Sequence, residues 1–589
     1  MWVVINKLLS FFKKKEKKKL LILLFMMIIA AILETAGIGL IIPLVGIVTE
    51  PSLIQTQPIL AFIFRLFHFD SNRVFIIFSV VSLLCVFVIK NLYLLFFNYA
   101  QVRVTSNQKV KLSKALFKEY LTKPYTFHLE RNTAELLRNV KDEVSTVFQG
   151  IVISGFQLFT EILVIICISA LLLVAAPIAT ITAFILLGGS VFTFFKLFRK
   201  KIRQLGKEQQ KVKGEMIKWV NQGLGASKEV KVSGKENFFI KSFGEKSQIS
   251  ANNSRYMEML EVVPRLFIET LLVGIVLVTL LIIVFQDTNT TQLVSTMAVF
   301  AMAAFRLMPS INRVMGLVTT IRYSLPALNV VYHDLIVTKT GLVPTMNPFH
   351  VINRGKRVFH HSIDLHNIYF RYPGQNNYAI TGVSLSIPIN HSVAFVGESG
   401  AGKTTLVDII LGLLEPEHGD ILVDGKHLHE QKSLWQQKIG YIPQSIYLSD
   451  DTIRGNVAFG LEKSEVDDLE IWRSLEQAQL KEFVERLPGK LDSFVGEHGV
   501  RLSGGQRQRI GIARALYHNP EILFMDEATS ALDNETETEI MKAIDGLKGE
   551  KTLIIIAHRL STIKNCDTVF KINNGELLTT TKKLAGTGV

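Results

Sequence analysis

Six long apolar runs occupy the first half of this 589-residue chain and limit what it can fold into. Each run reaches or exceeds the roughly 20 residues that a helix needs to cross the core of a bilayer. The runs extend over about Leu20 to Val48, Val74 to Ala100, Val147 to Ala176, Ile178 to Leu197, Leu266 to Phe285 and Leu293 to Val318. We therefore predict a domain of six membrane-spanning helices.

Lysine and arginine are distributed unevenly between the loops that join these runs. The formal net charge of +14 would suit a nucleic-acid-binding protein, but most of the excess flanks the apolar runs. Residues 103–141 and 196–246 are rich in Lys and Arg, whereas residues 286–292 contain neither. Because membrane proteins keep their positive loops in the cytoplasm, we place both termini there and expect no nucleic-acid partner.

Three segments outside the spans have a predicted form. The two basic stretches contain few prolines and glycines and favour helices that project from the membrane, with turns near 122–127 and 219–226, although mobile basic loops remain the alternative. Residues 1–19 resemble an interfacial helix with a lysine cluster. Residues 58–69 are apolar at helical spacing and too short to span, so they either touch lipid or pack on the outer end of the bundle.

Charged residues within the apolar runs are candidates for contact with a transported molecule. Such charges are expensive in a membrane and usually face an internal cavity. The cations are Lys90, Arg265, Arg306 and Arg313, and the carboxylates are Glu34, Glu161 and Glu269. We predict that the cations bind an anionic head group, with structural pairing to the carboxylates as the alternative.

A glycine-rich loop follows the apolar run Val393–Val396 and is typical of a phosphate-binding loop between a strand and a helix. Its residues are Gly397, Glu398, Ser399, Gly400, Ala401, Gly402, Lys403, Thr404 and Thr405. Backbone N–H groups of such a loop surround the phosphates of a nucleotide at the positive end of the helix. Lys403 would reach the outer phosphates, and the Thr404 hydroxyl would join the shell of a Mg²⁺ ion.

Two later segments extend this prediction. A buried strand ends in Asp526 and Glu527, where Asp526 would hold Mg²⁺ and Glu527 would orient or deprotonate the attacking water. A second glycine-containing loop precedes another helix and has the sequence Leu502, Ser503, Gly504, Gly505 and Gln506. One nucleotide does not need two such loops at this separation in one chain.

Together these motifs resemble the ATP-binding cassette (ABC) exporter half-transporters over nearly the whole chain. The resemblance implies that Leu502–Gln506 is the signature motif, which closes on ATP held by a second copy, so the protein would be a homodimer. It also implies that Tyr372 stacks on adenine, that Gln444 is the Q-loop glutamine near Mg²⁺, that Asp533 is the D-loop aspartate, and that His558 is the switch histidine acting with Glu527.

Within that family, the membrane half is most similar to the PglK-type flippases of lipid-linked oligosaccharides. The residues that suggest this are Glu34–Ala36 with Pro43, Val263–Arg265 with Glu269, and Arg306–Arg313. The resemblance implies a flippase in the bacterial inner membrane that moves a polyprenyl-pyrophosphate oligosaccharide outward for protein N-glycosylation. The alternative is an ABC exporter of another amphipathic cargo, such as a lipid A precursor, a drug or a peptide.

The predicted architecture is thus multidomain, with an all-α transmembrane domain followed by an α/β phosphate-loop ATPase domain. The boundaries are an interfacial helix at 1–19, the membrane domain at 20–328, a linker at 329–360 and the ATPase domain at 361–589. The prolines and glycines of 329–360 are what indicates a linker there.

Overall fold

The computed structural model describes residues 2–40, 44, 46–48, 51–175, 177–285, 290–338, 357–526, 534–557, 563 and 565–582. At some further positions inside the helices, including Arg306, the side chain lies outside the described set. The chain forms two compact units, each described below by itself. One comprises Met1–Thr122 and Arg131–Leu342, and the other comprises Lys123–Glu130 and Val343–Val589.

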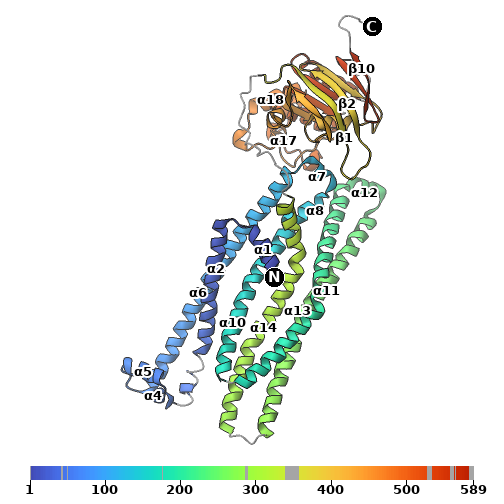
Figure 1. The fold of residues 1–589 in the computed structure, drawn as a ribbon. Coiled ribbons are helices and arrows are strands. Elements are labelled where there is room, and N and C mark those ends of the chain that lie inside the picture. The colour runs from blue at the N-terminus through green and yellow to red at the C-terminus, as the bar shows by residue number, and fades with distance from the viewer. Residues whose placement is uncertain are drawn as a thin grey trace. The chain divides into compact units, whose positions relative to one another are not determined.

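Six long helices build the first unit in the described part of the chain (Figure 1). They are α2 (Lys14–Gly39), α6 (Asn72–Thr122), α10 (Ser154–Ala175), α11 (Pro177–Gly225), α13 (Glu236–Phe285) and α14 (Thr290–Tyr332). The short elements are α1 (Trp2–Ser10), α4 (Leu53–Thr56), α5 (Pro58–Leu66), α8 (Thr133–Arg138), α9 (Val144–Val147), α12 (Ser227–Ser233) and three π-helical turns, η1 (Asn139–Glu143), η2 (Phe148–Ile153) and η3 (His333–Val337).

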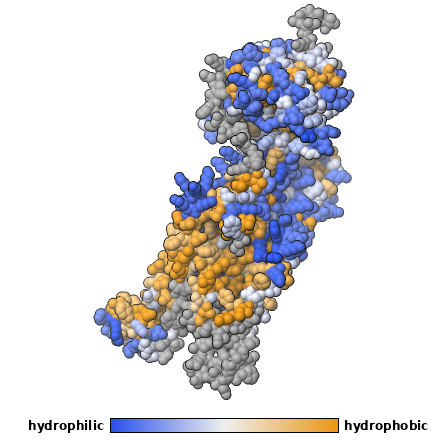
Figure 2. Space-filling view, viewed as in Figure 1, coloured by the Kyte–Doolittle hydropathy of each residue, from blue (hydrophilic) through white to orange (hydrophobic). Residues whose placement is uncertain are grey.

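The helical surface of this unit is apolar along part of its length. Among the described residues, three stretches are long and apolar enough to cross a membrane, namely Asn72–Thr122, Thr133–Ala170 and Met308–Val337. Figure 2 shows the apolar side chains gathered in one zone of these helices, with hydrophilic side chains beyond it. Exposed apolar residues on this scale are expected where lipid, and not water, is the solvent.

The basic stretches are helical, as predicted, and the mobile-loop alternative is wrong. Helices α6, α11 and α13 contain 51, 49 and 50 residues. At about 1.5 Å per residue each is roughly 75 Å long, more than twice the roughly 30 Å of a bilayer core. Two of them end at Thr122 and Gly225, within the predicted turns.

Several predicted boundaries differ from the helices found. The N-terminal helix stops at Ser10, and the lysine cluster from Lys14 onward belongs to α2. Helix α1 packs on α14, because Lys7 Nζ donates to Asn329 Oδ1 at 2.7 Å. Near residue 329 the predicted linker is still helix: α14 runs to Tyr332 and η3 to Val337, since the prolines and glycines that indicated a linker come later.

Helix α5 covers most of the segment predicted at 58–69 and packs on neighbouring helices, while its contact with lipid stays a prediction. Its Ile63 and Phe64 pack with Ile54 and Phe75 at the start of α6. On its other side Phe62 is 65% exposed.

A buried polar cluster joins the ends of α6 and α14. The Tyr120 hydroxyl donates to Asp334 Oδ2 at 2.6 Å, and Asn139 Nδ2 donates to the same oxygen at 3.3 Å. Arg138 Nη2 donates in turn to Asn139 Oδ1 at 2.9 Å. Burial, and then the neighbouring Asp334 carboxylate, raise the pKa of Tyr120, so its hydroxyl stays a donor. Because all four side chains are buried, the cluster fixes η1 and η3 against α6.

The second unit contains the predicted α/β domain, built on two sheets. The four-stranded sheet has the order β2 (Ile380–Pro388), β1 (Ser362–Phe370), β4 (His418–Val423) and β5 (Lys426–His427). The six-stranded sheet has the order β10 (Glu576–Lys582), β9 (Thr568–Asn573), β3 (Ser392–Val396), β8 (Thr552–Ile556), β7 (Ile522–Asp526) and β6 (Ile439–Ile442). The pairs β6–β7, β7–β8, β8–β3 and β3–β9 are all parallel.

The second unit also contains helices, and one of them comes from the first half of the sequence. The helices are α7 (Tyr125–Glu130), α15 (Lys403–Ile410), α16 (Lys432–Lys438), α17 (Ile453–Val457), α18 (Asp468–Gln477), α19 (Lys481–Arg486), α20 (Gly504–Leu516) and α21 (Asn534–Asp545), with 3₁₀ turns η4 (Lys463–Glu465), η5 (Lys490–Asp492) and η6 (Glu497–Gly499). Helix α7 directly follows α6 in sequence yet belongs to this unit.

Candidate nucleotide-binding site

The glycine-rich loop connects β3 to α15, as the sequence predicts. Strand β3 is almost wholly buried between β8 and β9, which fixes the start of the loop. Gly402 has φ of 101° and forms the N-cap of α15. A Cβ atom at Gly397 would collide with the carbonyl oxygen of Ile572. Glycine is therefore required at both positions for the loop to close around the start of the helix.

Lys403 occupies the interior of this loop. Its side chain is buried, and Nζ donates to the carbonyl oxygens of Gly397 and Glu398, both at 2.9 Å. The ammonium is thus held at the N-terminus of α15, where an anion is favoured by the helix dipole and by free N–H groups. This arrangement suits the phosphates of ATP.

The residues predicted to hold Mg²⁺ come from three elements around the loop. Thr404 begins α15, Asp526 ends β7, and Gln444 follows β6. Parallel pairing of Ile442 with Met525 brings the last two to the same edge of the sheet. Hydroxyl, carboxylate and amide oxygens are the donors that Mg²⁺ prefers, so these residues fit the ion.

A second carboxylate, Asp408, lies close to Asp526 and was not predicted from the sequence. Burial, and then the charge of Asp526, raise the pKa of Asp408 to about 6. Burial and the same two carboxylates raise the pKa of Tyr441 on β6. A second carboxylate near Asp526 is compatible with the cation predicted there.

Tyr125 of α7 belongs to this group of residues. Burial, and then Asp408 and Tyr372, raise the pKa of its hydroxyl. The α7 segment therefore lies within electrostatic reach of α15, the helix that follows the phosphate loop. Tyr125 lies within 122–127, where the sequence predicted a turn at the end of a projecting helix.

We expect Asp408→Asn to stabilise the protein without nucleotide and metal. A carboxyl with a raised folded-state pKa binds more protons folded than unfolded, so it destabilises the fold fully above pH 6 and progressively less toward pH 4. The shift from 3.8 corresponds to an upper bound of about 2–3 kcal/mol, less because Asp408 is partly exposed. Melting temperatures at pH 8 and pH 5 should show a gain at pH 8 that shrinks at pH 5. The exposed Asp450→Asn is the matched control, and an equal gain at both pH values would contradict the assignment.

Tyr372 lies beside the loop. Its hydroxyl is 3.0 Å from Thr405 Oγ1, and its ring packs edge-on against Phe370. The ring is half-buried, so one side of it is available for the predicted stacking on adenine, which stays a prediction.

The signature loop also precedes a helix, α20. Ser503 is its N-cap: Ser503 Oγ accepts from the Gln506 N–H at 3.3 Å, while Gln506 Oε1 accepts from the Ser503 N–H at 2.9 Å. This reciprocal capping box fixes the loop in the form of a second anion-binding N-terminus. Arg507 Nη1 donates to the Leu502 carbonyl at 3.2 Å and holds the preceding turn.

The predicted membrane cations have different surroundings. Arg313 Nε is 3.0 Å from Glu161 Oε1, so this pair follows the structural alternative, although 52% of the Arg313 side chain remains exposed. Lys90 Nζ lies 4.3 Å from the centre of the Phe87 ring, and Arg265 is exposed. Glu527, Asp533, His558 and the Arg306 side chain lie outside the described residues.

Sequence reasoning missed Asp408, Tyr125 and Tyr441. One signal was available: Asp408 is a lone carboxylate among Leu406, Val407, Ile409 and Ile410, and such a residue in an apolar helix indicates a buried polar contact.

Comparison with known proteins extends these observations. A family model described as the ABC transporter transmembrane region matches residues 20–308, and one described as ABC transporter matches residues 380–530. An ATP-dependent lipid A-core flippase of Saccharophagus degradans is 30% identical over 508 residues, which cover 85% of this chain and 83% of that protein. A protein of the same description from Thiobacillus denitrificans is 29% identical over 503 residues, covering 85% and 84%.

A solved structure is similar over nearly the whole chain. The structure of a bacterial Atm1-family ABC exporter with ATP bound aligns with a TM-score of 0.75 at 22% identity, covering 96% of this chain and 95% of that one. At this identity the likeness concerns the fold.

Proposed function

This chain belongs to the ABC exporters as a half-transporter that hydrolyses ATP, and on that premise we propose that two copies form a flippase for a phosphate-bearing glycolipid. The lipid would move from the inner to the outer leaflet of the bacterial inner membrane, with both termini of each chain in the cytoplasm. Each copy supplies the loop Gly397–Thr405 to one ATP and the loop Leu502–Gln506 to the other. Binding of ATP with Mg²⁺ would supply the free energy that brings the loops of the two copies together. Thr404, Gln444 and Asp526 are the residues suited to hold the ion.

Arg313 is the observation that carries the lipid assignment. It lies on α14 of the membrane unit, yet half of its side chain is exposed, and it is Nε that faces Glu161. A guanidinium presents several N–H donors in a fork that matches phosphate oxygens. Arg313 can therefore keep its carboxylate partner and still contact a phosphate, together with Lys90, Arg265 and Arg306 in our proposal.

Two glycolipids fit this chemistry. A lipid A-core molecule is the first candidate, because the relatives with about 30% identity over most of the chain carry that description. A polyprenyl-pyrophosphate oligosaccharide is the second, because Val263–Arg265 and Arg306–Arg313 resemble the flippases of such lipids. Both molecules combine phosphate groups with a long apolar part and a glycan.

Lipid-stimulated ATP hydrolysis in nanodiscs tests the roles of these arginines. We expect stimulation by a phosphate-bearing glycolipid in the native protein and its loss in Arg306→Ala with Arg313→Ala, while basal hydrolysis persists. Arg65→Ala, an exposed arginine of α5, is the matched control. If the lipid still stimulates ATP hydrolysis in the double variant, neither arginine is needed to recognise the lipid.

The Glu161 partner separates recognition from structure. If the ion pair is only structural, Arg313→Ala should lower the melting temperature and adding Glu161→Gln should restore it, because the unpaired charge is then removed. If Arg313 also binds the lipid, that second change should leave lipid stimulation lost.

A further inference from the structure

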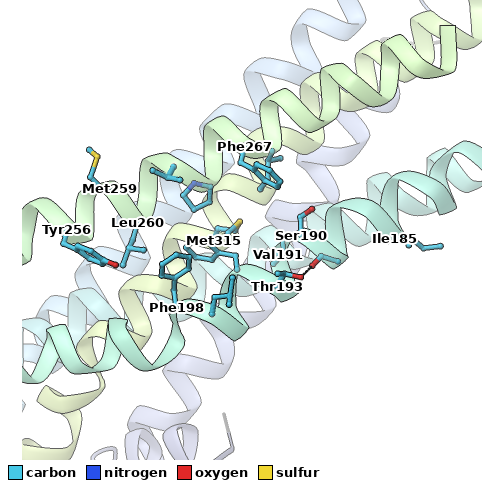
Figure 3. A pocket seen from close by; sticks show the side chains of 16 residues that line it. Ile185, Ser190, Val191, Thr193, Phe198, Tyr256, Met259, Leu260, Phe267 and Met315 are labelled. Carbon is cyan, nitrogen blue, oxygen red and sulfur yellow. Dashed lines mark hydrogen bonds between the residues drawn. The ribbon is translucent and has the colours of Figure 1, made fainter. Parts of the chain in front are cut away.

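A groove of about 800 Å³ lies between α11, α13 and α14 in the first unit. Figure 3 shows side chains of α11 and α13 converging on it, with Phe198, Tyr256 and Leu260 toward one end and Phe267 farther along. Met315 of α14 contributes to its lining. The volume is within the roughly 300–1,000 Å³ of small-molecule sites. None of the residues predicted to bind ATP or cargo lines it.

The groove is open to its surroundings along an apolar edge. Leu197, Val263 and Phe267, which line it, are 69%, 55% and 58% exposed. Its α11 residues from Ile185 to Phe198 cover about 20 Å at about 1.5 Å per residue, two thirds of a bilayer core of roughly 30 Å. The groove therefore has the length and the lining for a fatty chain.

Cations gather where this groove meets the basic stretch of α11. The guanidinium of Arg322 lies 4.8 Å from the centre of the Phe195 ring, and Phe195 packs against the groove residue Phe194. The charged group that acts on Arg322 is another cation, Arg199, one helical turn beyond Phe195. Lys201 Nζ lies 5.7 Å from the centre of the Tyr256 ring, which lines the groove.

Among the described residues, these two arginines have no carboxylate that compensates their charge. Within the described part of the chain, no ion pair or hydrogen bond joins Arg199 or Arg322 to an acidic side chain, whereas Arg313 on the same helix has Glu161. Two guanidinium groups held near one another repel, and an anion placed between them would remove the repulsion. The end of the apolar groove near Arg199 and Arg322 thus carries two positive groups whose N–H donors suit a phosphate.

We propose that the groove binds an anionic phospholipid of the inner leaflet, with one fatty chain against Phe194, Phe198 and Phe267 and the phosphate at Arg199 and Arg322. A glycolipid would need polar partners for its sugars, and the lining offers only a few hydroxyls, such as those of Ser190, Thr193 and Tyr256. The phospholipid site does not depend on the identity of the transported lipid.

Glycines on α11 provide a matched pair of variants. Gly189 lines the groove and Gly188 does not, yet a Cβ at either position meets nothing within 4 Å. Gly189→Leu should therefore fill the groove without disturbing the helix, and Gly188→Leu is its control. Arg199→Gln with Arg322→Gln removes the charge and keeps the side-chain length.

Native mass spectrometry of the detergent-purified protein measures the binding of phosphatidylglycerol and of phosphatidylcholine with the same chains. We expect phosphatidylglycerol to bind the native protein at least about tenfold more tightly, because the trimethylammonium group of phosphatidylcholine offsets the phosphate charge and is repelled by the two arginines. Gly189→Leu should weaken both lipids, and the double Arg variant should abolish only the preference.

Three results would overturn the proposal: equal binding of the two lipids by the native protein, equal effects of Gly188→Leu and Gly189→Leu, or tighter binding of a lipid A-core molecule that competes with phosphatidylglycerol. The last would make the groove part of the transport route. Retained ATP hydrolysis in each variant shows that it is folded.

Discussion

Replacing Glu527 with Gln is expected to slow ATP hydrolysis by about a hundredfold or more while ATP binding persists. In the sequence Glu527 directly follows Asp526, the last residue of β7, and β7 belongs to the same sheet as β3, the strand that precedes the phosphate loop. An amide there has the shape of the carboxylate but cannot accept the proton of the attacking water. The nucleotide contacts made by Lys403 and the loop backbone do not involve it, so affinity should remain.

Steady-state hydrolysis and the binding of a fluorescent ATP analogue, measured on the same preparation, distinguish these effects. Glu539→Gln on α21 makes the same chemical change at an exposed position and should leave both quantities near those of the native protein. Hydrolysis within a few-fold of native in Glu527→Gln would show that another group activates the water.

Mixed dimers are expected to reveal which loops act together. In our proposal one ATP lies between the phosphate loop of one copy and the signature loop of the other. Lys403→Ala in one chain and Ser503→Arg in its partner would then damage the same site and leave the second site complete. Both changes in one chain would damage both sites, since that chain contributes one loop to each.

The expected result is substantial ATP hydrolysis when the changes lie in different chains and almost none when they lie in the same chain. Differently tagged chains, purified in sequence through both tags, give the required dimers. If each chain held ATP with its own two loops, the pattern would be reversed. The two models predict opposite rankings of ATP hydrolysis for the two kinds of dimer, so partial activity in either dimer still distinguishes them.

Local motifs were the part of the site that the sequence could predict. The loop from Gly397 to Thr405 and the capping box at Ser503 and Gln506 depend on neighbours within a few residues, and the structure has them where they were expected. The alternation of apolar runs and basic stretches likewise predicted the long helices, because length and hydropathy are properties of a continuous segment.

Contacts between distant residues were not predictable in this way. Tyr120 meets Asp334 across 214 positions, and the charges that act on Tyr125 come from Asp408 and Tyr372 in the other half of the chain. The pairing of Arg313 with Glu161 was anticipated only as an alternative, because a charge in a membrane helix has the same sequence pattern whether it faces a carboxylate or a cargo. The Arg199 and Arg322 pair gave no signal, since both lie where basic residues are expected at a membrane interface.

Helix boundaries failed for a related reason. The prolines and glycines of 329–360 predict a linker there, and this prediction ends α14 too early. Residues 329–337 instead continue as helix, with Val331 and Leu335 buried. Tertiary packing extends a helix beyond the point at which local composition changes.

The most direct test of the proposed flippase is lipid translocation in proteoliposomes. Labelled lipid A-core, a polyprenyl-pyrophosphate glycan and a cationic amphiphile are placed in the membrane, and the fraction that reaches the opposite leaflet is measured with and without ATP. We expect ATP-dependent transfer of a phosphate-bearing glycolipid by the native protein and none by Glu527→Gln. Transfer of the cationic amphiphile alone, or glycolipid transfer that continues without ATP, would contradict it.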